Sequence, residues 1–372
     1  MAIANSAPPW LERFRGARVL VTGHTGFKGS WMCEWLLSLG AEVHGFALQP
    51  PTDPALFDQL DLAARMTSRL ADVRDRAALG QVLNDARPEF VFHMAAQPLV
   101  RRSYREPHET FTTNFVGTLN LLEELRLSAI PSAVVTVTSD KCYEGSLTGE
   151  PMSESSLLGG RDCYSASKGA VELLVSSYRR SFFMNKGSLV KLATARAGNV
   201  LGGGDWSEDR IIPDCVRSLA AERVIAVRNP SATRPWQHVL EPLAGYLLLA
   251  SRLADGSLDS ELRSETADAA AFNFGPADES ERSVQEVVEE VLKTWPGSWD
   301  LTDHQQAPHE SARLSLSSLK ARQLLGWRPV WTFSEAIRHT VKWYAETCAE
   351  PKRAPAMTRQ QIAEYQRSLE ER

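Results

Sequence analysis

Short apolar runs alternate with longer segments of helical periodicity through the first half of the chain. The runs have the length and the β-rich content of buried strands, and they fall at residues 17–22, 42–48, 68–71, 89–93, 133–138 and 189–195. Between them, helical patterns fall at residues 26–39, 75–86, 108–128 and 164–183. Strand and helix alternating at this spacing predict an α/β fold with a Rossmann-like, doubly wound parallel sheet.

The pattern loosens beyond residue 198, where glycines follow one another at 202–204 and prolines are scattered. We expect residues 1–198 to form the Rossmann-like domain. Residues 199–372 are expected to form mainly a smaller α/β carboxy-terminal domain that binds the substrate. The two domains are interleaved, because segments near 236–250 and 271–275 are expected to return to the first.

Further helices are predicted at residues 283–294 and 334–347. The tail, residues 351–372, is polar, which predicts an exposed helix or a partly frayed segment.

Composition places the chain among ordinary globular proteins, since its 372 residues are 43% hydrophobic and 23% charged, with a net charge of −5. The 41 basic residues are dispersed, so we expect no nucleic acid partner. No segment approaches the ~20 apolar residues of a membrane span, so we expect no membrane partner. Residues 1–16 lack a signal peptide pattern, and the five cysteines lack metal-ligand spacing. A cytoplasmic protein without a metal is expected.

A glycine-rich turn follows the first strand and opens the first helix. Glycines at this spacing let the backbone approach a pyrophosphate, and the helix amino end offers free N–H groups. The strand–turn–helix setting favours a dinucleotide site over a plain turn. The residues expected to contact the cofactor here are Gly23, His24, Thr25, Gly26, Phe27, Lys28 and Gly29.

The second strand ends at Gly45-Phe46-Ala47-Leu48, with neither an acidic residue nor a nearby arginine. The rule that separates NAD from NADP therefore gives no answer. Asp72, after the third strand, is a candidate partner for the adenine amine, and Val73 beside it is a further candidate for the cofactor site. Asp72 could equally cap the helix expected at 75–86.

A tyrosine and a lysine stand four residues apart in Tyr164-Ser-Ala-Ser-Lys168. That spacing puts both side chains on one face of a helix, where the ammonium lowers the pKa of the phenol. Such a phenol is a usable base for an alcohol proton. With the dinucleotide loop, the pair predicts an enzyme that oxidises a carbinol with a bound nicotinamide. The upstream cluster Ser139-Asp140-Lys141 indicates that oxidation is not the whole reaction.

These motifs, with His93-Met-Ala-Ala96 between them, resemble the extended short-chain dehydrogenase/reductases that act on nucleotide sugars. Further stretches are similar to the branch of 4,6-dehydratases that use CDP-glucose: His24–Lys28, Thr138–Tyr143, Gly202–Trp206 and Arg234–Val239. The resemblance covers nearly the whole chain. It implies a seven-stranded nucleotide-binding sheet, a small substrate domain and tightly held NAD, with Ala95 and Ala96 in the cofactor site.

The resemblance also implies a hydro-lyase reaction on CDP-glucose, in which C4 is oxidised, water leaves across C5–C6 and the hydride returns to C6. Tyr164 is implied to take the proton of the 4-hydroxyl. Lys168 is implied to depress the Tyr164 pKa and to bind the nicotinamide ribose, and Ser139 to bridge Tyr164 and the 4-oxygen. Asp140 is implied to protonate the departing 6-hydroxyl, for which its carboxyl must hold a proton.

Lys141 departs from the better-known dehydratases, which have a glutamate at this position that acts as the C5 base. A neutral lysine in a dry pocket is one possible replacement, since burial lowers a lysine pKa. A salt bridge that orients Asp140 is the other. That bridge would favour ionised Asp140, which conflicts with the acid role, so both alternatives stay open.

The substrate carries a pyrophosphate, which calls for bidentate guanidinium contacts. Arg234 matches the family's phosphate-binding arginine, and Arg210 is a second candidate. The resemblance places Asn199 at the nucleotide phosphate and His309 at the nucleotide end. Gln97, after the fourth strand, is expected to face the sugar or the nicotinamide.

Other functions stay open. A nucleotide-sugar 4-epimerase would share the loop, Tyr164 and Lys168, but it would lack an acid after the serine because epimerisation expels no water. A 4,6-dehydratase acting on another nucleotide-hexose is a second alternative. A non-catalytic NAD(P)-binding regulator would not need Ser139 or Tyr164. Family members pair through the helices expected at 108–128 and 164–183, which implies a homodimer or homotetramer.

Overall fold

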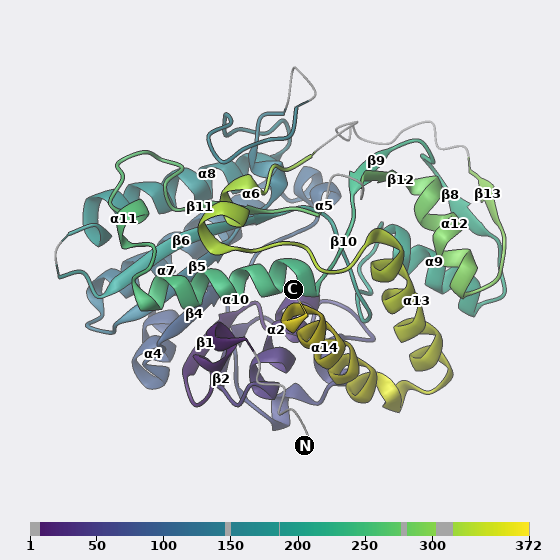
Figure 1. The fold of residues 1–372 in the computed structure, drawn as a ribbon, viewed down its shortest axis with the longest axis horizontal. Helices are drawn as coiled ribbons and strands as arrows, with labels where there is room; N and C mark the ends of the chain where they lie inside the picture. Colours follow the sequence, from purple (N-terminus) through teal and green to yellow (C-terminus); the bar gives the residue numbers. More distant parts are fainter. Residues whose placement is uncertain (1–7, 146–149, 186, 277–280, 303–314, 372) are drawn as a thin grey trace.

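A seven-stranded sheet forms the centre of the computed structural model, which describes residues 8–145, 150–185, 187–276, 281–302 and 315–371 (Figure 1). Its strands are β1 (Arg18–Thr22), β2 (Glu42–Ala47), β3 (Thr67–Leu70), β4 (Phe90–His93), β5 (Ser132–Val137), β6 (Val190–Ala197) and β11 (Ala271–Phe274). All neighbours pair in parallel in the order β11-β6-β5-β4-β1-β2-β3. The predicted doubly wound sheet is confirmed, and its order reverses between β1 and β4, where such sheets bind ligands.

Helices cover both faces of the sheet (Figure 1). One face carries α2 (Phe27–Ser38), α10 (Leu240–Asp255) and α14 (Ala354–Glu370), and the other carries α4 (Arg76–Ala86), α7 (Gly117–Leu127) and α8 (Cys163–Tyr178). Each face has its own apolar core. Trp31 and Leu247 are fully buried in the first core, and Leu121 and Leu125 are fully buried in the second.

The long helix expected at residues 108–128 is interrupted. It consists of α6 (Pro107–Phe111), the π-helical segment η2 (Thr112–Val116) and α7, and α8 likewise continues into a π-helical segment, η4 (Arg179–Phe183). Within η2, the buried Asn114 amide donates to the Gln97 carbonyl at 3.2 Å and to Ser167 Oγ at 2.8 Å. The wider turn thus aims a polar side chain at the loop after β4, a common use of π-helical turns.

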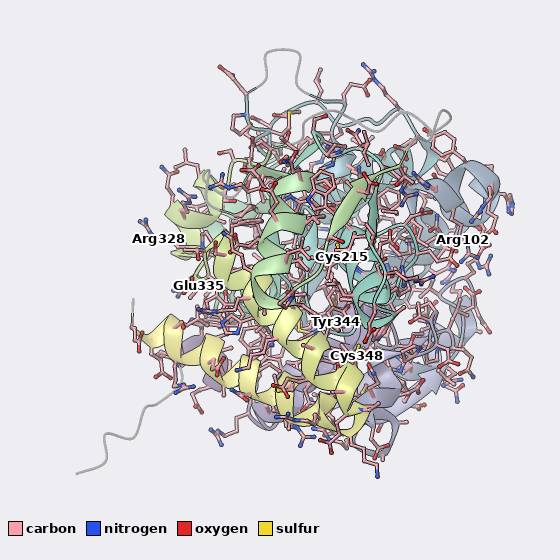
Figure 2. All side chains as sticks on the ribbon, turned by 90° about the vertical axis from the view of Figure 1, so that its right-hand side faces the viewer. Arg102, Cys215, Arg328, Glu335, Tyr344 and Cys348 are labelled. Atoms are coloured by element: carbon pink, nitrogen blue, oxygen red, sulfur yellow. The ribbon has the colours of Figure 1, made fainter. Side chains whose placement is uncertain are left out.

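The second half of the chain adds helices and short strand pairs. Its helices are α9 (Ile211–Ala220), α12 (Val284–Thr294) and α13 (Phe333–Ala349), and its strand pairs are β7 (Val200–Leu201) with β10 (Gln237–His238), β8 (Ile225–Val227) with β13 (Trp299–Leu301), and β9 (Thr233–Pro235) with β12 (Glu281–Ser283). Capping boxes start α12 and α13, as Ser283 pairs with Glu286 and Thr332 with Glu335. Figure 2 looks onto this end, where Cys215 marks α9 and Tyr344 marks α13.

Short helices complete the described chain: α1 (Pro9–Glu12), α3 (Leu56–Gln59), α5 (Val100–Arg105), α11 (Asp259–Leu262), η1 (Leu62–Ala64), η3 (Asp140–Cys142), η6 (Ala321–Leu325) and η7 (Pro351–Arg353). The cysteines are all free thiols. Within the part of the chain that the structure describes, none of the helices combines the length and the apolar character needed to cross a bilayer.

The tail forms the expected helix, but this helix is neither frayed nor fully exposed, because α14 packs on α2. Its buried residues recur with helical spacing: Ala354, Met357, Thr358, Gln361, Ile362 and Tyr365. The Tyr365 ring meets Trp35 of α2 edge-on at 5.7 Å, and Arg359 pairs with the fully buried Glu34 at 2.7 Å. The polar composition of the tail concealed this narrow apolar stripe.

Candidate active site

The carboxyl ends of neighbouring strands bring the sequence motifs to one edge of the sheet. The glycine-rich turn follows β1, Ala95 and Ala96 follow β4, Ser139-Asp140-Lys141 follows β5 and Asn199 follows β6. Because these strands are adjacent and parallel, the segments after them lie side by side.

The glycine-rich turn has the shape of a dinucleotide cradle. Gly23 has φ +77°, and a Cβ there would lie 2.8 Å from the Ala95 nitrogen. A Cβ on Gly29 would lie 2.1 Å from the Gly23 oxygen, so packing alone requires glycine at both positions. At Gly26, which caps α2, the nearest atom would be 3.4 Å away. The protein leaves room at Gly26, beside the helix amino end, and this space fits the pyrophosphate of NAD.

The side chains of the glycine-rich turn mostly hydrogen-bond or pack against other parts of the protein. His24 Nε2 lies 2.7 Å from Ser68 Oγ, and Thr25 Oγ1 donates to the Leu48 carbonyl at 2.9 Å. Burial lowers the pKa of His24 to about 4, so its ring is neutral at physiological pH. Phe27 packs against Gly202, where a Cβ would lie 2.9 Å from the Phe27 Cζ. His24 and Thr25 therefore anchor the turn, and its backbone is left to meet a cofactor.

Lys28 reaches from the turn toward the reaction centre. Its Nζ lies over the Tyr246 ring, 5.9 Å from the centroid. Burial, together with the charge of Arg210, lowers the pKa of Lys28 to about 8, and Asp140 opposes the shift. Its cofactor role stays a prediction, and these interactions place its ammonium group near Asp140.

The adenine end of the expected site contains Asp72 and Val73. Asp72 does not cap α4, because the N-cap is Asp75, which accepts from the Ala78 nitrogen at 3.0 Å. Asp72 instead accepts from the Arg74 nitrogen at 2.8 Å and from its guanidinium, which lowers the Asp72 pKa. The Val73 side chain is buried. The adenine role of Asp72 stays a prediction.

The structure brings Ser139, Asp140 and Tyr164 together. Ser139 caps η3, and its hydroxyl donates to Asp140 Oδ1 at 2.9 Å and accepts from the Lys141 nitrogen at 3.2 Å. Asp140 is 3% exposed and Tyr164 is 7% exposed. Tyr164, in the first turn of α8, lies close enough to Ser139 for the serine hydroxyl to lower the pKa of the phenol. A hydroxyl, a carboxyl and a phenol thus share one buried corner.

The expected lowering of the Tyr164 pKa by Lys168 was wrong. Burial raises the pKa of Tyr164 to about 12, although hydrogen bonding to Ser139 opposes the shift. Lys168 Nζ donates to the Val137 carbonyl at 3.3 Å, and burial lowers the pKa of Lys168 to about 8. Desolvation of the phenolate therefore outweighs the effect of neighbouring charges.

Lys141 is partly exposed. The Asp140 carboxyl is hydrogen-bonded by the Ser139 hydroxyl. Among the described residues, no ion pair joins Lys141 to Asp140. The alternative in which a salt bridge orients Asp140 is thus not formed in this structure, and the Ser139 hydroxyl orients the carboxyl instead.

Two of the predicted substrate ligands are arginines at different places in the site. Arg210 caps α9, pairs with Asp205 at 2.8 Å, and is close enough to Tyr164 to lower its pKa. Arg234 lies in β9 and is buried. Asn199 is partly exposed between β6 and β7, and His309 lies outside the described residues.

The Gln97 side chain is hydrogen-bonded within the loop after β4, and its role toward the substrate stays a prediction. Its amide nitrogen donates to Thr110 Oγ1 at 2.9 Å and to the Leu99 carbonyl at 3.1 Å, while its oxygen accepts from the Leu99 nitrogen at 2.6 Å. With its amide engaged in this way, Gln97 shapes the loop after β4. Arg102, beyond this loop, lies at the molecular edge in Figure 2.

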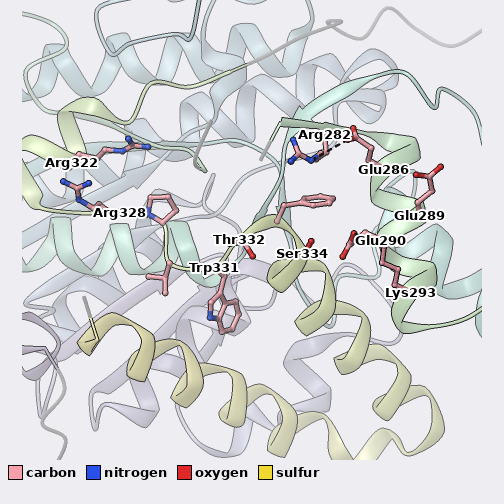
Figure 3. Close-up of a pocket in the computed structure, with 13 residues that line it drawn as sticks. Arg282, Glu286, Glu289, Glu290, Lys293, Arg322, Arg328, Trp331, Thr332 and Ser334 are labelled. Atoms are coloured by element: carbon pink, nitrogen blue, oxygen red, sulfur yellow. Dashed lines mark hydrogen bonds and ion pairs between the residues drawn. The ribbon is translucent and has the colours of Figure 1, made fainter. Parts of the chain in front are cut away.

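A pocket of about 650 Å³ opens elsewhere, between α12 and the start of α13 (Figure 3). Four of its charged side chains form two ion pairs, as Arg282 lies 3.6 Å from Glu286 and Lys293 lies 2.6 Å from Glu290. Its lining contains none of Ser139, Asp140 and Tyr164. The reactive groups therefore lie away from this pocket, at the carboxyl ends of the sheet strands.

A buried ion pair that was not predicted from the sequence lies behind the reactive corner. Glu172, on α8, lies eight residues after Tyr164, and its carboxylate pairs with Arg196 of β6 at 2.7 Å. The sequence signal was the spacing, because Tyr164, Lys168 and Glu172 follow one another at four-residue intervals on one helix face.

Fold and site together define an extended short-chain dehydrogenase/reductase, with a glycine turn after β1 and a Tyr–Lys pair beside a Ser–Asp cluster after β5. The family model described as GDP-mannose 4,6 dehydratase matches residues 20–340, and the chain belongs to this family.

Relatives and solved structures agree with this assignment. The chain is 46% identical over 338 residues to a CDP-glucose 4,6-dehydratase of Salmonella typhimurium, covering 89% of this chain and 91% of the relative. DesIV, a dTDP-glucose 4,6-dehydratase of Streptomyces venezuelae with NAD bound, is 25% identical, with a TM-score of 0.75 over 90% of this chain and 99% of that one. A UDP-glucose 4-epimerase of Thermotoga maritima has the same fold, with a TM-score of 0.74 at 20% identity over 88% of this chain and 99% of that one.

Proposed function

We propose that this protein dehydrates CDP-D-glucose to CDP-4-keto-6-deoxy-D-glucose with bound NAD. The observation that carries the proposal is the buried Asp140 carboxyl, held by Ser139 beside Tyr164. An oxidising Tyr–Lys pair needs no such acid, whereas loss of water does. The 46% identity to a CDP-glucose 4,6-dehydratase supports the nucleotide.

In the proposed reaction, Tyr164 accepts the proton of the sugar 4-hydroxyl, and Ser139 bridges the phenol and the 4-oxygen. Bound NAD supplies the hydride acceptor at C4 and later the hydride donor at C6. Lys168 holds the nicotinamide ribose. Since burial raises the Tyr164 pKa to about 12, the phenol needs a further neighbouring positive charge to become a base near neutrality. The oxidised nicotinamide ring carries such a charge.

Asp140 protonates the departing 6-hydroxyl in this proposal. Its position at the end of β5 is fixed by η3 and by the Ser139 hydroxyl, 2.9 Å from Oδ1. Burial at 3% exposure keeps bulk water from the carboxyl. Such shielding suits an acid that must deliver its proton to one oxygen.

Lys141 is the candidate base for the C5 proton, which the 4-ketone makes acidic, and it would return that proton to C5 when the hydride is delivered to C6. The lack of an ion pair with Asp140 among the described residues leaves its amine available for this step. This role would replace the glutamate of the better-known dehydratases.

A 4-epimerase is the rival within the same fold. It would need the dinucleotide turn and Tyr164, but epimerisation leaves no place for an acid at Asp140.

Arg210 and Arg234 are the proposed pyrophosphate ligands, with Asn199 on the nucleotide phosphate.

The helix layer containing α6, η2 and α8 supports self-association. Large apolar side chains are exposed on it: Phe111 at 38%, Val116 at 36%, Leu173 at 57% and Phe182 at 42%. We propose that these helices pair two copies of the chain into a dimer, which could associate further into a tetramer.

The free thiols fit a reducing compartment, so we propose that the enzyme works in the cytoplasm.

The test is incubation with a panel of nucleotide-diphospho-hexoses, with mass spectrometry for loss of one water and alkali treatment for the ultraviolet band of a 4-keto sugar. We expect CDP-glucose to be converted. CDP-glucose labelled with deuterium at C4 should give product with deuterium on the new C6 methyl. Epimerised product without loss of water, or conversion of another nucleotide only, would refute the proposal.

A further inference from the structure

Tyr246 is a second phenol near the reaction centre. It lies on α10, is 0% exposed, and its oxygen has no hydrogen-bond partner in the part of the chain that the structure describes. A buried polar group without a partner destabilises a fold, so such groups are uncommon and are often kept for a ligand.

The Tyr246 ring is held in place. It meets Phe274 of β11 edge-on, with centroids 5.7 Å apart and an interplanar angle of 76°. Phe274 in turn meets Trp327 at 5.1 Å, and Lys28 Nζ lies 5.9 Å from the Tyr246 centroid on the side of the dinucleotide turn. The hydroxyl therefore has a fixed position, determined by apolar contacts that do not involve its oxygen.

That position is at the reaction centre. Burial raises the Tyr246 pKa, and the nearby Tyr164 and Asp140 raise it further, so the phenol is neutral and can both donate and accept a hydrogen bond. α10 covers the face of the sheet that also carries α2, whereas α8 with Tyr164 covers the opposite face (Figure 1). Two phenols thus approach the same edge from opposite sides.

We propose that the Tyr246 hydroxyl hydrogen-bonds the nicotinamide end of the bound dinucleotide. Its neighbour Lys28 belongs to the turn that opens α2, so the phenol is on the cofactor side of the centre. The carboxamide of the nicotinamide offers a hydrogen-bond donor and an acceptor, and a neutral phenol can pair with either one. A fully buried group also suits a retained ligand better than a sugar that must enter and leave at each turnover. The inference rests on NAD binding in the proposed function but not on the identity of the sugar.

The test compares NAD with ADP-ribose, which lacks the nicotinamide, on protein freed of nucleotide. Tyr246→Phe keeps the ring contacts and removes only the unpaired oxygen. We expect the Kd for NAD to rise about three- to tenfold, as for one lost hydrogen bond, and the Kd for ADP-ribose to stay unchanged. The melting temperature of the nucleotide-free variant should not fall.

Tyr365→Phe is the matched control, because its hydroxyl donates to Glu241 at 2.7 Å. This variant should melt at a lower temperature and bind NAD like the wild type. An unchanged NAD affinity in Tyr246→Phe, or equal weakening of NAD and ADP-ribose, would overturn the inference. So would a rise confined to the KM for CDP-glucose, or a fall in the melting temperature without nucleotide. If the wild type binds NAD but forms no 4-keto sugar, the proposed function fails while this test still decides the role of Tyr246.

Discussion

Glu172 and Arg196 form a buried ion pair, 2.7 Å between Oε2 and Nη2, directly behind the catalytic segment. Thr138, which precedes Ser139, donates its hydroxyl to Glu172. Arg196 donates to the hydroxyl of Tyr143, which follows η3, at 2.7 Å. The pair therefore fixes both ends of the turn that presents Ser139 and Asp140.

We expect Glu172→Gln to destabilise the fold and to change the pH dependence of activity. Removing one partner of a buried pair costs about 3–5 kcal/mol, because the other charge is left uncompensated. Glu172 also raises the pKa of Lys168 against the effect of burial, which lowers it to about 8. Without that negative charge, Lys168 loses its proton at lower pH, so the alkaline limb of kcat/KM should move to lower pH. Denaturant unfolding and a pH–rate profile measure the two effects.

Glu241→Gln is the control for this prediction. Glu241 is another fully buried carboxylate, and it accepts from the Val330 and Trp331 backbone nitrogens. Its variant should lose stability without moving the alkaline limb. A Glu172→Gln enzyme with an unchanged profile would show that the pair has a structural role only.

Tyr164→Phe should lower turnover by ~10²–10⁴-fold, the usual effect of removing a general base. NAD should remain bound, because the glycine turn and Lys168 are untouched. Formation of 4-keto sugar and retention of NAD on a desalting column measure the two quantities. Undiminished turnover would contradict the base assignment.

Asp140→Asn should separate oxidation from dehydration. The amide keeps the size of the side chain but cannot deliver a proton to the 6-hydroxyl. With CDP-glucose, we expect bound NADH to accumulate, visible by its absorbance, while no water is lost. A normal yield of the 4-keto-6-deoxy product would argue against the acid role.

Acid should destabilise the dinucleotide turn through His24. Its folded pKa of about 4 lies below the ordinary histidine value of 6.5, so the unfolded chain takes up a proton first as the pH falls. The free energy of unfolding should therefore fall between about pH 6.5 and pH 4, by ~3 kcal/mol in total from this group. The buried His93 adds a change of the same sign.

Denaturant unfolding across this pH range tests the effect. His24→Asn should flatten the fall, whereas His108→Asn, at an exposed position, should not. Equal slopes in the wild type and His24→Asn would contradict the assignment.

Leu173→Glu should weaken self-association, since this side chain is 57% exposed on α8 and a charge would oppose burial of the helix face. Light scattering after size exclusion measures the mass. Leu301→Glu, at a residue 61% exposed on β13, is the control that should keep the wild-type mass. A wild-type mass for Leu173→Glu would exclude this face from the interface.

Much of the sheet was readable because buried parallel strands are continuous apolar runs bounded by turns. The segment 133–138 is an example, since β5 is buried along its whole length. The break at Thr112–Val116 was not readable, because a π-helical turn depends on what the buried Asn114 meets in the folded protein. Local periodicity contains no information about that partner.

Within the site, the spacing of residues along the sequence predicted which side chains lie next to one another. It did not predict how deeply those side chains are buried. The four-residue interval between Tyr164 and Lys168 places them on one face of α8, as expected. The pKa of Tyr164 depends on burial, which is a property of the whole fold and which raises it to about 12. Gln97 illustrates the same limit, since its hydrogen bond to Thr110 links residues from separate elements.

The packing of α14 on α2 also bears on how the protein is made. Glu34 can pair with Arg65 early in synthesis, but its other partner, Arg359, is made much later. Strand β11, at the edge of the sheet, is likewise made late. We therefore expect the nascent sheet and the helix layer on α2 to remain incomplete until β11 and α14 have been made, with α14 then closing over α2.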